Sequence, residues 1–462
     1  MRDTADAGNF AEGRVWRRIL AQALPLTLAE IVQVTYTIVD RIYLGHLSEQ
    51  DSMALIGIGV AFPIIALIGA FTSLYGQGGA PLFAIARGQG RDDRASLLQG
   101  CTFTLLLGTG LVIMALFMAL RRPMLRLFGA SEASYPYADE YMKIYLLGTP
   151  FTMIATGMNG FINAQGYPRV GMGTTVLGAA INLVLDPVFL FVLHWGIRGV
   201  AVATVISQVI SCLWVARFLT GRRAALPLRR EHMRVEPRML RDILSLGVVG
   251  FIMKATNSLV QIAANATLRN YGGDLYVGAM TVVNSVREVL SMPVTGVTSG
   301  AQPVLGYNYG AGKHDRVREG IRFMTFAAVG YTCAAWIAVL WQAPALTGLF
   351  TSDAALRAIT PHALRLYFFG FFFQAFQTSA QSTFQALGDA RHAIFFSLLR
   401  KVVIVTPLTL LLPALGLGVD GVFWAEPISN ALGGLAAFTT MIRTVYRKRV
   451  KEDGAVMQGR GT

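Results

Sequence analysis

Two carboxylates lie inside long apolar segments of the N-terminal half, and they are the residues there best suited to chemistry. Asp40 stands in IVQVTYTIVDRIYLG and Asp186 in INLVLDPVFLF. If these segments span a membrane, a carboxylate at the centre of such a helix costs about 2.5 to 3.5 kcal/mol on insertion scales, so each one needs a function or a partner. Asp40 lies 22 residues beyond Arg18, and Asp186 lies 17 beyond Arg169. At about 1.5 Å per residue, both carboxylates lie in the outer half of the bilayer.

Oxygen-bearing side chains accompany both carboxylates at helical spacing. Tyr36 and Asn182 each precede one of the aspartates by four residues, which places each pair on one helix face. Thr204 lies about 9 Å inward from the outer side and so reaches the same depth. Asn159 and Asn163 are likewise four residues apart.

Together these groups predict an ion-coupling site. Carboxylate, hydroxyl and amide oxygens suit a hard cation such as Na⁺, whereas a desolvated carboxylate can take up a proton instead, so both ions stay open. The alternative is that Asp40 pairs with neighbouring Arg41 at the outer interface and that Asp186, before Pro187, only satisfies loosened backbone. The predicted ion-coupling residues are Asp40, Asp186, Asn182, Thr204, Tyr36 and Asn159, with Asp40, Asn182, Asp186 and Thr204 as the ligands if the ion is Na⁺.

The C-terminal half carries different polar residues. Lys254, about 11 residues into its segment, and Glu288, about 12 residues into the next from the other side, both reach mid-membrane. They predict a buried ion pair, which could equally line a substrate path because a buried pair is weak evidence for stability. Arg400 and Lys401 lie shallower and could snorkel toward the interface.

An aromatic run in the same half is a second candidate for substrate handling. The segment FFGFFFQAFQTSAQ interleaves rings with glutamines. Such rings suit planar organic cations through stacking and cation–π contact, although the run could simply face lipid or neighbouring helices. The predicted substrate pathway consists of Lys254, Glu288, Phe372, Gln374 and Gln377.

The composition of the chain indicates that these residues lie in a membrane. The chain is 54% hydrophobic and 14% charged, with a mean hydropathy of +0.51, whereas soluble proteins carry about 25% charged residues. The net charge of +14 does not indicate nucleic-acid binding, because the Lys and Arg residues occupy alternate loops. The three cysteines fall inside apolar runs and are expected to be buried hydrophobes rather than disulfide partners. The class is therefore an integral membrane protein.

Hydropathy predicts twelve membrane-spanning helices. The bases concentrate in every second loop, among them the linker from Arg222 to Arg241 and the tail YRKRVK, so both termini are expected to be cytoplasmic. The predicted spans are 19–44, 53–84, 97–119, 138–163, 172–194, 200–219, 243–268, 276–306, 320–342, 361–386, 393–413 and 421–443.

An internal repeat divides these spans into two sets of six. PLFAIARGQGRDDR from Pro81 aligns with PVLGYNYGAGKHDR from Pro303, an offset of 222 residues that also pairs Gly166 with Gly388 and recurs over some 120 residues. Six spans per half give both halves the same orientation, related by a pseudo-twofold axis along the membrane normal. The predicted parts are a cytoplasmic segment 1–18, an N-lobe 19–219, a basic linker 220–242, a C-lobe 243–443 and a basic tail 444–462.

The order of motifs resembles the multidrug and toxic compound extrusion (MATE) family. The similar segments are VDRIYLGHL, GGAPLFAIARGQG, its repeat SGAQPVLGYNYGAGK, AQGYPRVG and NLVLDP, and the resemblance covers nearly all of residues 15 to 445. It is closest to bacterial members whose ion site lies in the N-terminal lobe. It implies a two-lobe, all-helical transporter of the bacterial inner membrane that exports cationic or amphipathic compounds in exchange for H⁺ or Na⁺.

The resemblance also assigns residues. The family's N-lobe cation site would fall on Asp40, Asn182, Asp186 and Thr204, with Tyr36 and Asn159 beside them. Another branch of the family places acidic residues in its seventh and tenth spans. Here the seventh offers Asn257 and Lys254, and the tenth offers only glutamines, which argues against a C-lobe Na⁺ site.

Two other functions remain to be compared with drug export. A flippase for lipid-linked saccharides could share the architecture, and it would be expected to line its cavity with more cations. An enzyme is disfavoured because the spans hold no HExxH, GxSxG or GxxxxGK[ST] motif and no paired His and Asp. We expect no cofactor beyond the coupling ion, no nucleic-acid partner, contact with membrane lipid, and a monomer.

Overall fold

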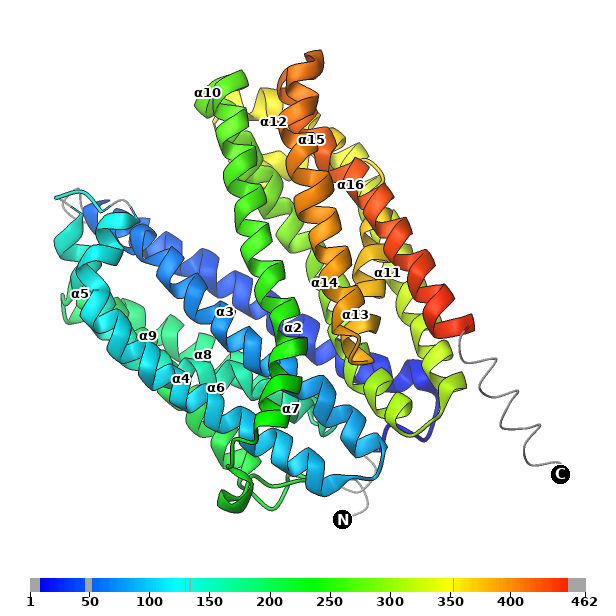
Figure 1. Cartoon of the computed structure of the whole chain (residues 1–462). Coiled ribbons are helices and arrows are strands. Elements are labelled where there is room, and N and C mark those ends of the chain that lie inside the picture. The colour runs from blue at the N-terminus through cyan, green and yellow to red at the C-terminus, as the bar shows by residue number, and fades with distance from the viewer. Residues whose placement is uncertain (1–8, 46–51, 129, 133, 352, 448–462) are drawn as a thin grey trace. The chain divides into compact units, whose positions relative to one another are not determined.

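The computed structural model describes residues 9–45, 52–128, 130–132, 134–351 and 353–447 (Figure 1). The side chains of residues 37–45, 52–58, 446 and 447 lie outside this description. Within the described residues every regular element is a helix, which confirms the predicted all-α class.

The helices of the N-terminal half follow the predicted spans closely. The fourth predicted span is not one helix: α5, α6 and α7 share it, with a short 3₁₀ turn at Leu146–Gly148. The elements are α2 (Val15–Gly45), α3 (Ser52–Gly88), α4 (Asp92–Leu127), α5 (Tyr135–Tyr145), α6 (Thr149–Gly157), α7 (Asn159–Ala164), α8 (Pro168–Pro187), the π-helix η3 (Val188–Val192) and α9 (Gly196–Leu219).

The helices of the C-terminal half repeat this order. A short turn, η4 (Arg230–His232), lies in the linker before them. The elements are α10 (Pro237–Gly310), α11 (His314–Phe350), α12 (Ala354–Tyr367), α13 (Phe372–Ala386), α14 (Ala390–Leu398), the π-helix η5 (Leu399–Val405), α15 (Thr406–Leu412), the π-helix η6 (Pro413–Leu417), α16 (Gly418–Met441) and the π-helix η7 (Ile442–Arg447).

The longest helix, α10, contains two membrane passes. Its 74 residues would extend about 111 Å at 1.5 Å per residue, far beyond a hydrocarbon core of about 30 Å. Gly273 breaks it with φ 72° and ψ −171°, a conformation open to glycine. We call the part of α10 before Gly273 its first arm and the part after Gly273 its second arm.

The observed helices account for all twelve predicted membrane spans. Eight helical stretches of the described chain are long and apolar enough to cross a membrane, and two of them, Pro237–Gly310 and Ala390–Val445, each cover two predicted spans. The remaining two predicted spans are the divided ones, built from α5 to α7 and from α12 and α13.

Helix boundaries support the internal repeat. The offset of 222 residues carries the end of α3 at Gly88 onto the end of α10 at Gly310, and it carries α9 (Gly196–Leu219) onto α16 (Gly418–Met441). The two halves therefore share one order of helices.

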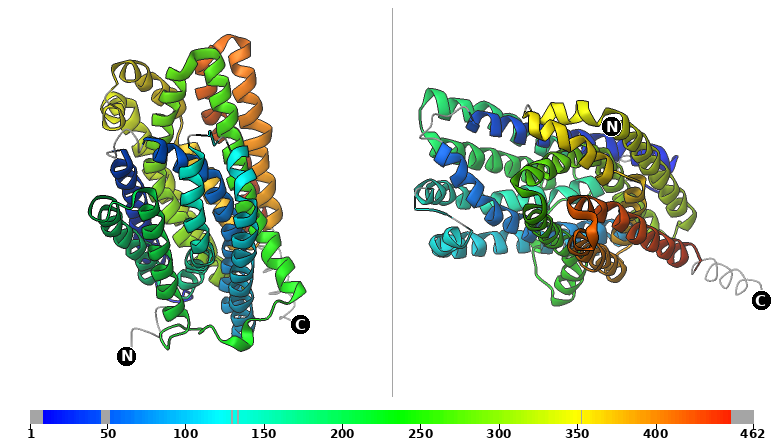
Figure 2. Two further views of the ribbon diagram at one scale, coloured as in Figure 1. Left: turned by 90° about the vertical axis from the view of Figure 1, so that its left-hand side faces the viewer. Right: turned by 90° about the horizontal axis from the view of Figure 1, so that it is seen from above.

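The chain forms two compact units. Unit 1 comprises Met1–Glu12 and Leu24–Phe251, and unit 2 comprises Gly13–Ala23 and Ile252–Thr462, masked positions apart. Within each unit the helices lie side by side as a bundle (Figures 1 and 2). The core of unit 1 includes Phe83 and Phe161, whose rings meet edge to face at 5.3 Å, and that of unit 2 includes Phe368 and Phe423.

Candidate functional site

A cavity of about 710 Å³ in unit 1, called here the unit 1 cavity, contains most of the predicted ion-coupling residues. Tyr36 of α2, Asn159 of α7, Asn182 of α8 and Thr204 of α9 all line it. The remote helix α2 and the consecutive helices α7, α8 and α9 therefore bring polar side chains to one space.

A hydrogen-bonded group centred on Asn182 lies at the wall of this cavity. The Tyr36 hydroxyl donates to Asn182 Oδ1 at 3.1 Å, and the Ser207 hydroxyl donates to the same oxygen at 3.3 Å. The amide nitrogen of Asn182 donates to Asp186 Oδ2. Since Asn182 has both its oxygen and its nitrogen engaged, it links hydroxyls of α2 and α9 to the carboxylate of α8.

Asp186 is the buried charge of this group. Its residue is 1% exposed and Asn182 is 2% exposed, and a carboxylate removed from water is costly unless it is hydrogen-bonded or neutralised. The π-helix η3 begins two residues later, after Pro187, which lacks a backbone donor. The bond from Asn182 gives Asp186 a side-chain partner one turn earlier on its own helix.

Thr204 and Asn159 occupy other parts of the cavity wall. The Thr204 hydroxyl donates to the Val200 carbonyl at 2.9 Å, which leaves its oxygen lone pairs able to accept or to ligate. The Asn159 amide donates to the Gly171 carbonyl at 3.2 Å, and its oxygen accepts from Thr174 at 3.5 Å. Asn159 therefore joins α7 to α8.

Asp40 belongs to α2, four residues after Tyr36, but its side chain lies outside the described residues. Its role remains a prediction. The Tyr36–Asn182 bond nonetheless brings the α2 residue one turn before it to the α8 group.

The donor set determines what this site could hold. Hydroxyl, amide and carboxylate oxygens are the ligands that hard cations prefer. Among the described residues, no group of three or more His, Cys, Asp and Glu side chains could hold a metal ion. The arrangement suits a monovalent cation or a proton bound at the carboxylate.

The sequence reasoning missed Ser207, and the signal for it is present. In α9 the polar residues Thr204, Ser207, Gln208 and Ser211 recur at spacings of three and four, and all four line the cavity. A polar stripe at that spacing on an otherwise apolar helix indicates a face turned away from lipid.

The predicted buried pair of the C-terminal half is not observed in that form. Lys254 and Glu288 lie on the first and second arms of α10, and both residues are exposed. Equal depth in the membrane therefore did not imply that either residue is buried. Their place on a substrate path stays a prediction.

The aromatic run on α13 packs against neighbouring helices. The Phe372 ring meets Trp336 edge to face at 5.4 Å, Gln374 donates to Ser291 at 3.5 Å, and Gln377 is buried. These contacts agree with the alternative that the run packs between helices, and substrate binding there remains a prediction.

Snorkelling is the wrong expectation for Lys401. The Lys401 and Glu426 side chains are 7% and 8% exposed, and Lys401 Nζ lies 3.4 Å from Glu426 Oε1. Arg400 Nη1 reaches the same carboxylate oxygen at 2.9 Å. Both cations point into unit 2 instead of toward the interface.

The sequence of the chain is similar to a known protein family and to several of its characterised members. The sequence profile of the MatE family matches residues 25–188 and 251–411. Multidrug export protein MepA of Staphylococcus haemolyticus (strain JCSC1435) is 23% identical over 448 residues, covering 96% of this chain and 97% of the relative. MepA of Staphylococcus aureus (strain MRSA252) is 22% identical over 446 residues, again covering 96% and 97%.

Solved structures share the fold. One, described as the outward-facing conformation of a multidrug resistance MATE family transporter of the MOP superfamily, matches with a TM-score of 0.89 at 22% identity, covering 96% of this chain and 98% of that chain. This similarity confirms the two-lobe arrangement of twelve helices that the repeat predicts.

Proposed function

The chain belongs to the MatE family, and from that premise we propose that it is an antiporter that exports cationic or amphipathic organic compounds in exchange for H⁺ or Na⁺. The relatives named above are multidrug export proteins and not enzymes, which supports export over a flippase for lipid-linked saccharides. We place the protein in a bacterial inner membrane, with both termini cytoplasmic, acting as a monomer.

The observation that carries this proposal is the buried group of Asp186, Asn182, Tyr36 and Ser207 beside a cavity large enough for an organic molecule. Ligand cavities of about 300 to 1,000 Å³ hold drug-sized compounds, and the unit 1 cavity of 710 Å³ falls in that range. A coupling ion and an organic cation would both be attracted to the same buried negative charge. Competition between them provides the exchange that antiport requires.

Ion binding would act through the Asn182 group. A proton on Asp186 removes its charge and weakens the charge-assisted hydrogen bond from Asn182, while Na⁺ would draw the Asn182 oxygen and the Thr204 hydroxyl toward itself. Either event changes bonds that join α8 to α2 and α9. A difference in ion affinity between two conformations is what shifts their populations and drives alternating access.

Gradient-driven efflux tests the proposal. The full chain is reconstituted in vesicles loaded with ethidium, and efflux is followed under an imposed H⁺ or Na⁺ gradient for wild type, Asp40→Asn and Asp186→Asn. We expect one gradient to drive efflux in wild type and both variants to lose most of it, because each removes one negative charge from the ion site.

Asp93→Asn is the matched control, because Asp93 is an exposed carboxylate at the first turn of α4. Efflux of this variant should equal that of wild type. Undiminished efflux in both Asp40→Asn and Asp186→Asn would exclude the proposed ion site. A rate of wild-type efflux that is the same with and without either gradient would exclude ion-coupled antiport.

A further inference from the structure

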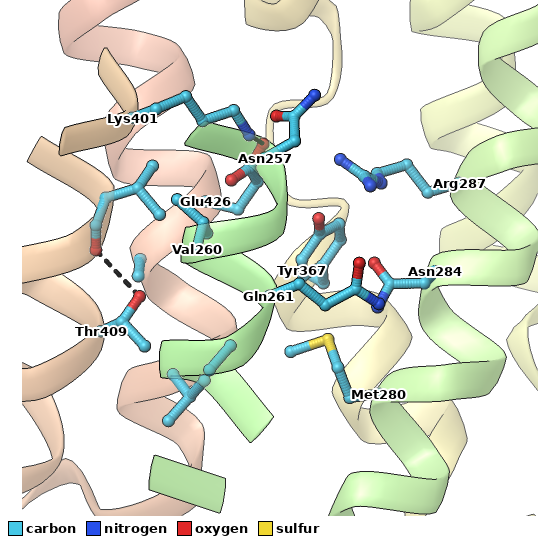
Figure 3. A pocket seen from close by; sticks show the side chains of 14 residues that line it. Asn257, Val260, Gln261, Met280, Asn284, Arg287, Tyr367, Lys401, Thr409 and Glu426 are labelled. Carbon is cyan, nitrogen blue, oxygen red and sulfur yellow. Dashed lines mark hydrogen bonds and ion pairs between the residues drawn. The ribbon is translucent and has the colours of Figure 1, made fainter. Parts of the chain in front are cut away.

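A second, smaller cavity lies within unit 2, called here the unit 2 cavity, and it is lined by basic and amide side chains (Figure 3). It holds about 50 Å³, bounded by both arms of α10, the end of α12, and η5, α15 and α16. Its polar lining residues are Asn257, Gln261, Asn284, Arg287, Tyr367, Lys401, Thr409 and Glu426.

The cations around this cavity outnumber its carboxylate. Arg400 Nη1 and Lys401 Nζ share one oxygen of Glu426, at 2.9 and 3.4 Å, and Arg400 also donates to Asn430 Oδ1 at 2.6 Å. Arg287, on the second arm of α10, is partly buried and within electrostatic range of Glu426. Three basic side chains therefore surround one buried carboxylate, and the one further carboxylate within electrostatic range of Arg287 is the exposed Glu288 next to it.

An excess of buried positive charge is unfavourable by itself. Removing a charge from water costs several kcal/mol per ion in real proteins, and a partner of opposite sign is needed to offset that cost. Here the carboxylate of Glu426 is already shared between two cations, while Arg287 and the amides of Gln261 and Asn284 face the cavity (Figure 3). An anion in the cavity would supply the missing negative charge.

The size and the donors limit that anion. A site needs roughly 10 to 15 Å³ of such space to hold one water molecule, so 50 Å³ accepts a halide or a carboxylate group but no large polyanion. A guanidinium presents a planar fork that matches a carboxylate, and an ammonium adds a point charge that also suits a halide. Both kinds of donor are present in Arg287 and Lys401.

The internal repeat relates this cavity to the one in unit 1. Adding 222 to Ile65, Tyr145 and Ala179, which line the unit 1 cavity, gives Arg287, Tyr367 and Lys401, which line the unit 2 cavity. The same step takes Thr204 to Glu426. The duplicated fold thus contains one pocket twice. The tyrosine is the same in both copies, whereas Ile65, Ala179 and Thr204 of the first copy correspond to Arg287, Lys401 and Glu426 of the second.

We infer that the unit 2 cavity is a binding site for a monovalent anionic group of the size of a carboxylate, held by Arg287 and Lys401 with the surrounding amides. The group is either a free small anion or the carboxylate of an amphipathic compound. This site stands apart from the cation site proposed for unit 1 and does not depend on it.

Equilibrium dialysis of the purified full chain in detergent tests the inference. The probes are ³⁶Cl⁻, ¹⁴C-acetate and ¹⁴C-benzoate, with uncharged benzamide as a competitor that should displace none of them. We expect wild type to bind at least one anion, and Arg287→Gln and Lys401→Met each to weaken that binding about tenfold or more.

Two further variants separate anion binding from a purely structural role. Glu426→Gln removes the resident negative charge and is expected to tighten anion binding about tenfold, whereas a structural ion pair predicts no gain. Arg391→Gln removes one exposed cation from the start of α14, outside the cavity lining, and should bind as wild type does.

The outcomes are distinct. Binding of chloride or acetate identifies a free anion as the ligand, and binding of benzoate without either identifies the carboxylate of an amphipath. The inference is overturned if wild type binds none of the three anions, if Arg287→Gln and Lys401→Met bind as wild type does, or if Glu426→Gln fails to bind more tightly.

Discussion

Asn182 connects three polar side chains of the unit 1 site. Its oxygen accepts from Tyr36 and Ser207, and its nitrogen donates to Asp186. Each such bond is worth about 0.5 to 1.5 kcal/mol, and a bond to a charged group is worth about 1.5 to 3. Asn182→Leu is therefore expected to raise the ion concentration for half-maximal efflux by about tenfold or more, measured in reconstituted vesicles.

Removing one hydroxyl group at a time should give smaller effects than Asn182→Leu. Tyr36→Phe and Ser207→Ala each remove one neutral hydrogen bond to Asn182, so each should change the same ion concentration by about two- to tenfold. Thr220→Ala is the control, since Thr220 lies just past the end of α9, far along the chain from Ser207, and its exposed hydroxyl donates to the Ala216 carbonyl one turn earlier. An Asn182→Leu variant as active as wild type would show that the group is not coupled to transport.

At the residue scale, the sequence predicts how deep a side chain lies in the membrane but not the direction in which it leaves the helix axis. The i,i+4 spacing of Asn182 and Asp186 predicts their contact because both residues share one helix. Depth alone could not predict that Lys254 and Glu288 are exposed. Distance along a helix axis does not state the angle around it, and that angle is determined by packing against helices far away in the sequence.

Lys401 illustrates a second limit. It lies in η5, a π-helical segment, and the wider turn changes the direction in which side chains leave the axis relative to a regular 3.6-residue period. Its partner Glu426 is 25 residues away on α16. Neither the local widening nor that pairing follows from periodicity, so snorkelling was the default expectation.

At the scale of elements, α3 and the start of α10 cross through glycines. A Cβ atom on Gly247 would lie 1.6 Å from the Leu74 carbonyl oxygen, and one on Gly78 would lie 2.1 Å from that of Ile243. Both neighbours are backbone, which cannot rotate away. Small residues at such crossings let helix backbones approach closely.

Gly247→Val should therefore separate these helices within unit 1. Overpacking typically costs about 1 to 3 kcal/mol, so we expect a clear fall in the temperature of thermal unfolding in detergent. Gly108→Ala is the control, because a Cβ there meets no atom within 4 Å and alanine favours a helix over glycine. Equal unfolding temperatures for both variants would contradict the close crossing.

A three-residue ion cluster joins α4 to α5. Asp139 contacts Arg121, and the two side chains are 12% and 13% exposed, while Lys143 lies 2.7 Å from the second carboxylate oxygen and is 53% exposed. Arg121→Met leaves a mostly buried carboxylate poorly compensated and should cost about 1 to 3 kcal/mol. Lys143→Met removes an exposed partner and should cost at most about 0.5 kcal/mol.

Thermal unfolding of the two variants measures this difference directly. Each substitution removes one positive charge and places a methionine, so the pair is matched in chemistry and differs chiefly in burial. A larger loss for Lys143→Met than for Arg121→Met would mean that burial does not set the strength of this cluster.

Element boundaries were predictable where hydropathy changes and unpredictable where it does not. The predicted span 200–219 corresponds to α9 (Gly196–Leu219), because charged or polar residues flank it. The span 138–163 is divided into α5, α6 and α7. Both sides of those breaks are apolar, so the sequence shows no change in polarity there, although Pro150 at the start of α6 is a local signal.

At the scale of the whole molecule, duplication preserved the fold more strictly than the chemistry. Each half provides six passes in the same order, and equivalent positions line a cavity in each unit. Those positions hold uncharged residues in unit 1 and Arg287, Lys401 and Glu426 in unit 2. The sequence predicted the repeated architecture from loop motifs, but the second cavity could be recognised only once the helices were packed.

The distribution of bases predicts how the molecule is oriented. Glu132 belongs to the connection after α4, one of the set of loops that is poorer in bases as a whole, and Glu231 belongs to the basic linker. The passes of α5 to α7, α8 and α9 separate the two glutamates, and three passes place them on opposite sides of the membrane. By the positive-inside tendency the linker is cytoplasmic.

Glu132→Cys and Glu231→Cys form a matched pair for testing this orientation, because both side chains are exposed. Native Cys101 and Cys212 are buried and Cys333 is partly buried, so all three are replaced by alanine to remove background. A membrane-impermeant maleimide should label Glu132→Cys in intact cells and Glu231→Cys only after permeabilisation.

The opposite labelling pattern would show that the orientation is the reverse of the predicted one. Labelling of both cysteines from one side would contradict the three passes between them. Because the ion site lies in the outer half of the bilayer only if this orientation holds, the same result also tests the depth assigned to Asp186.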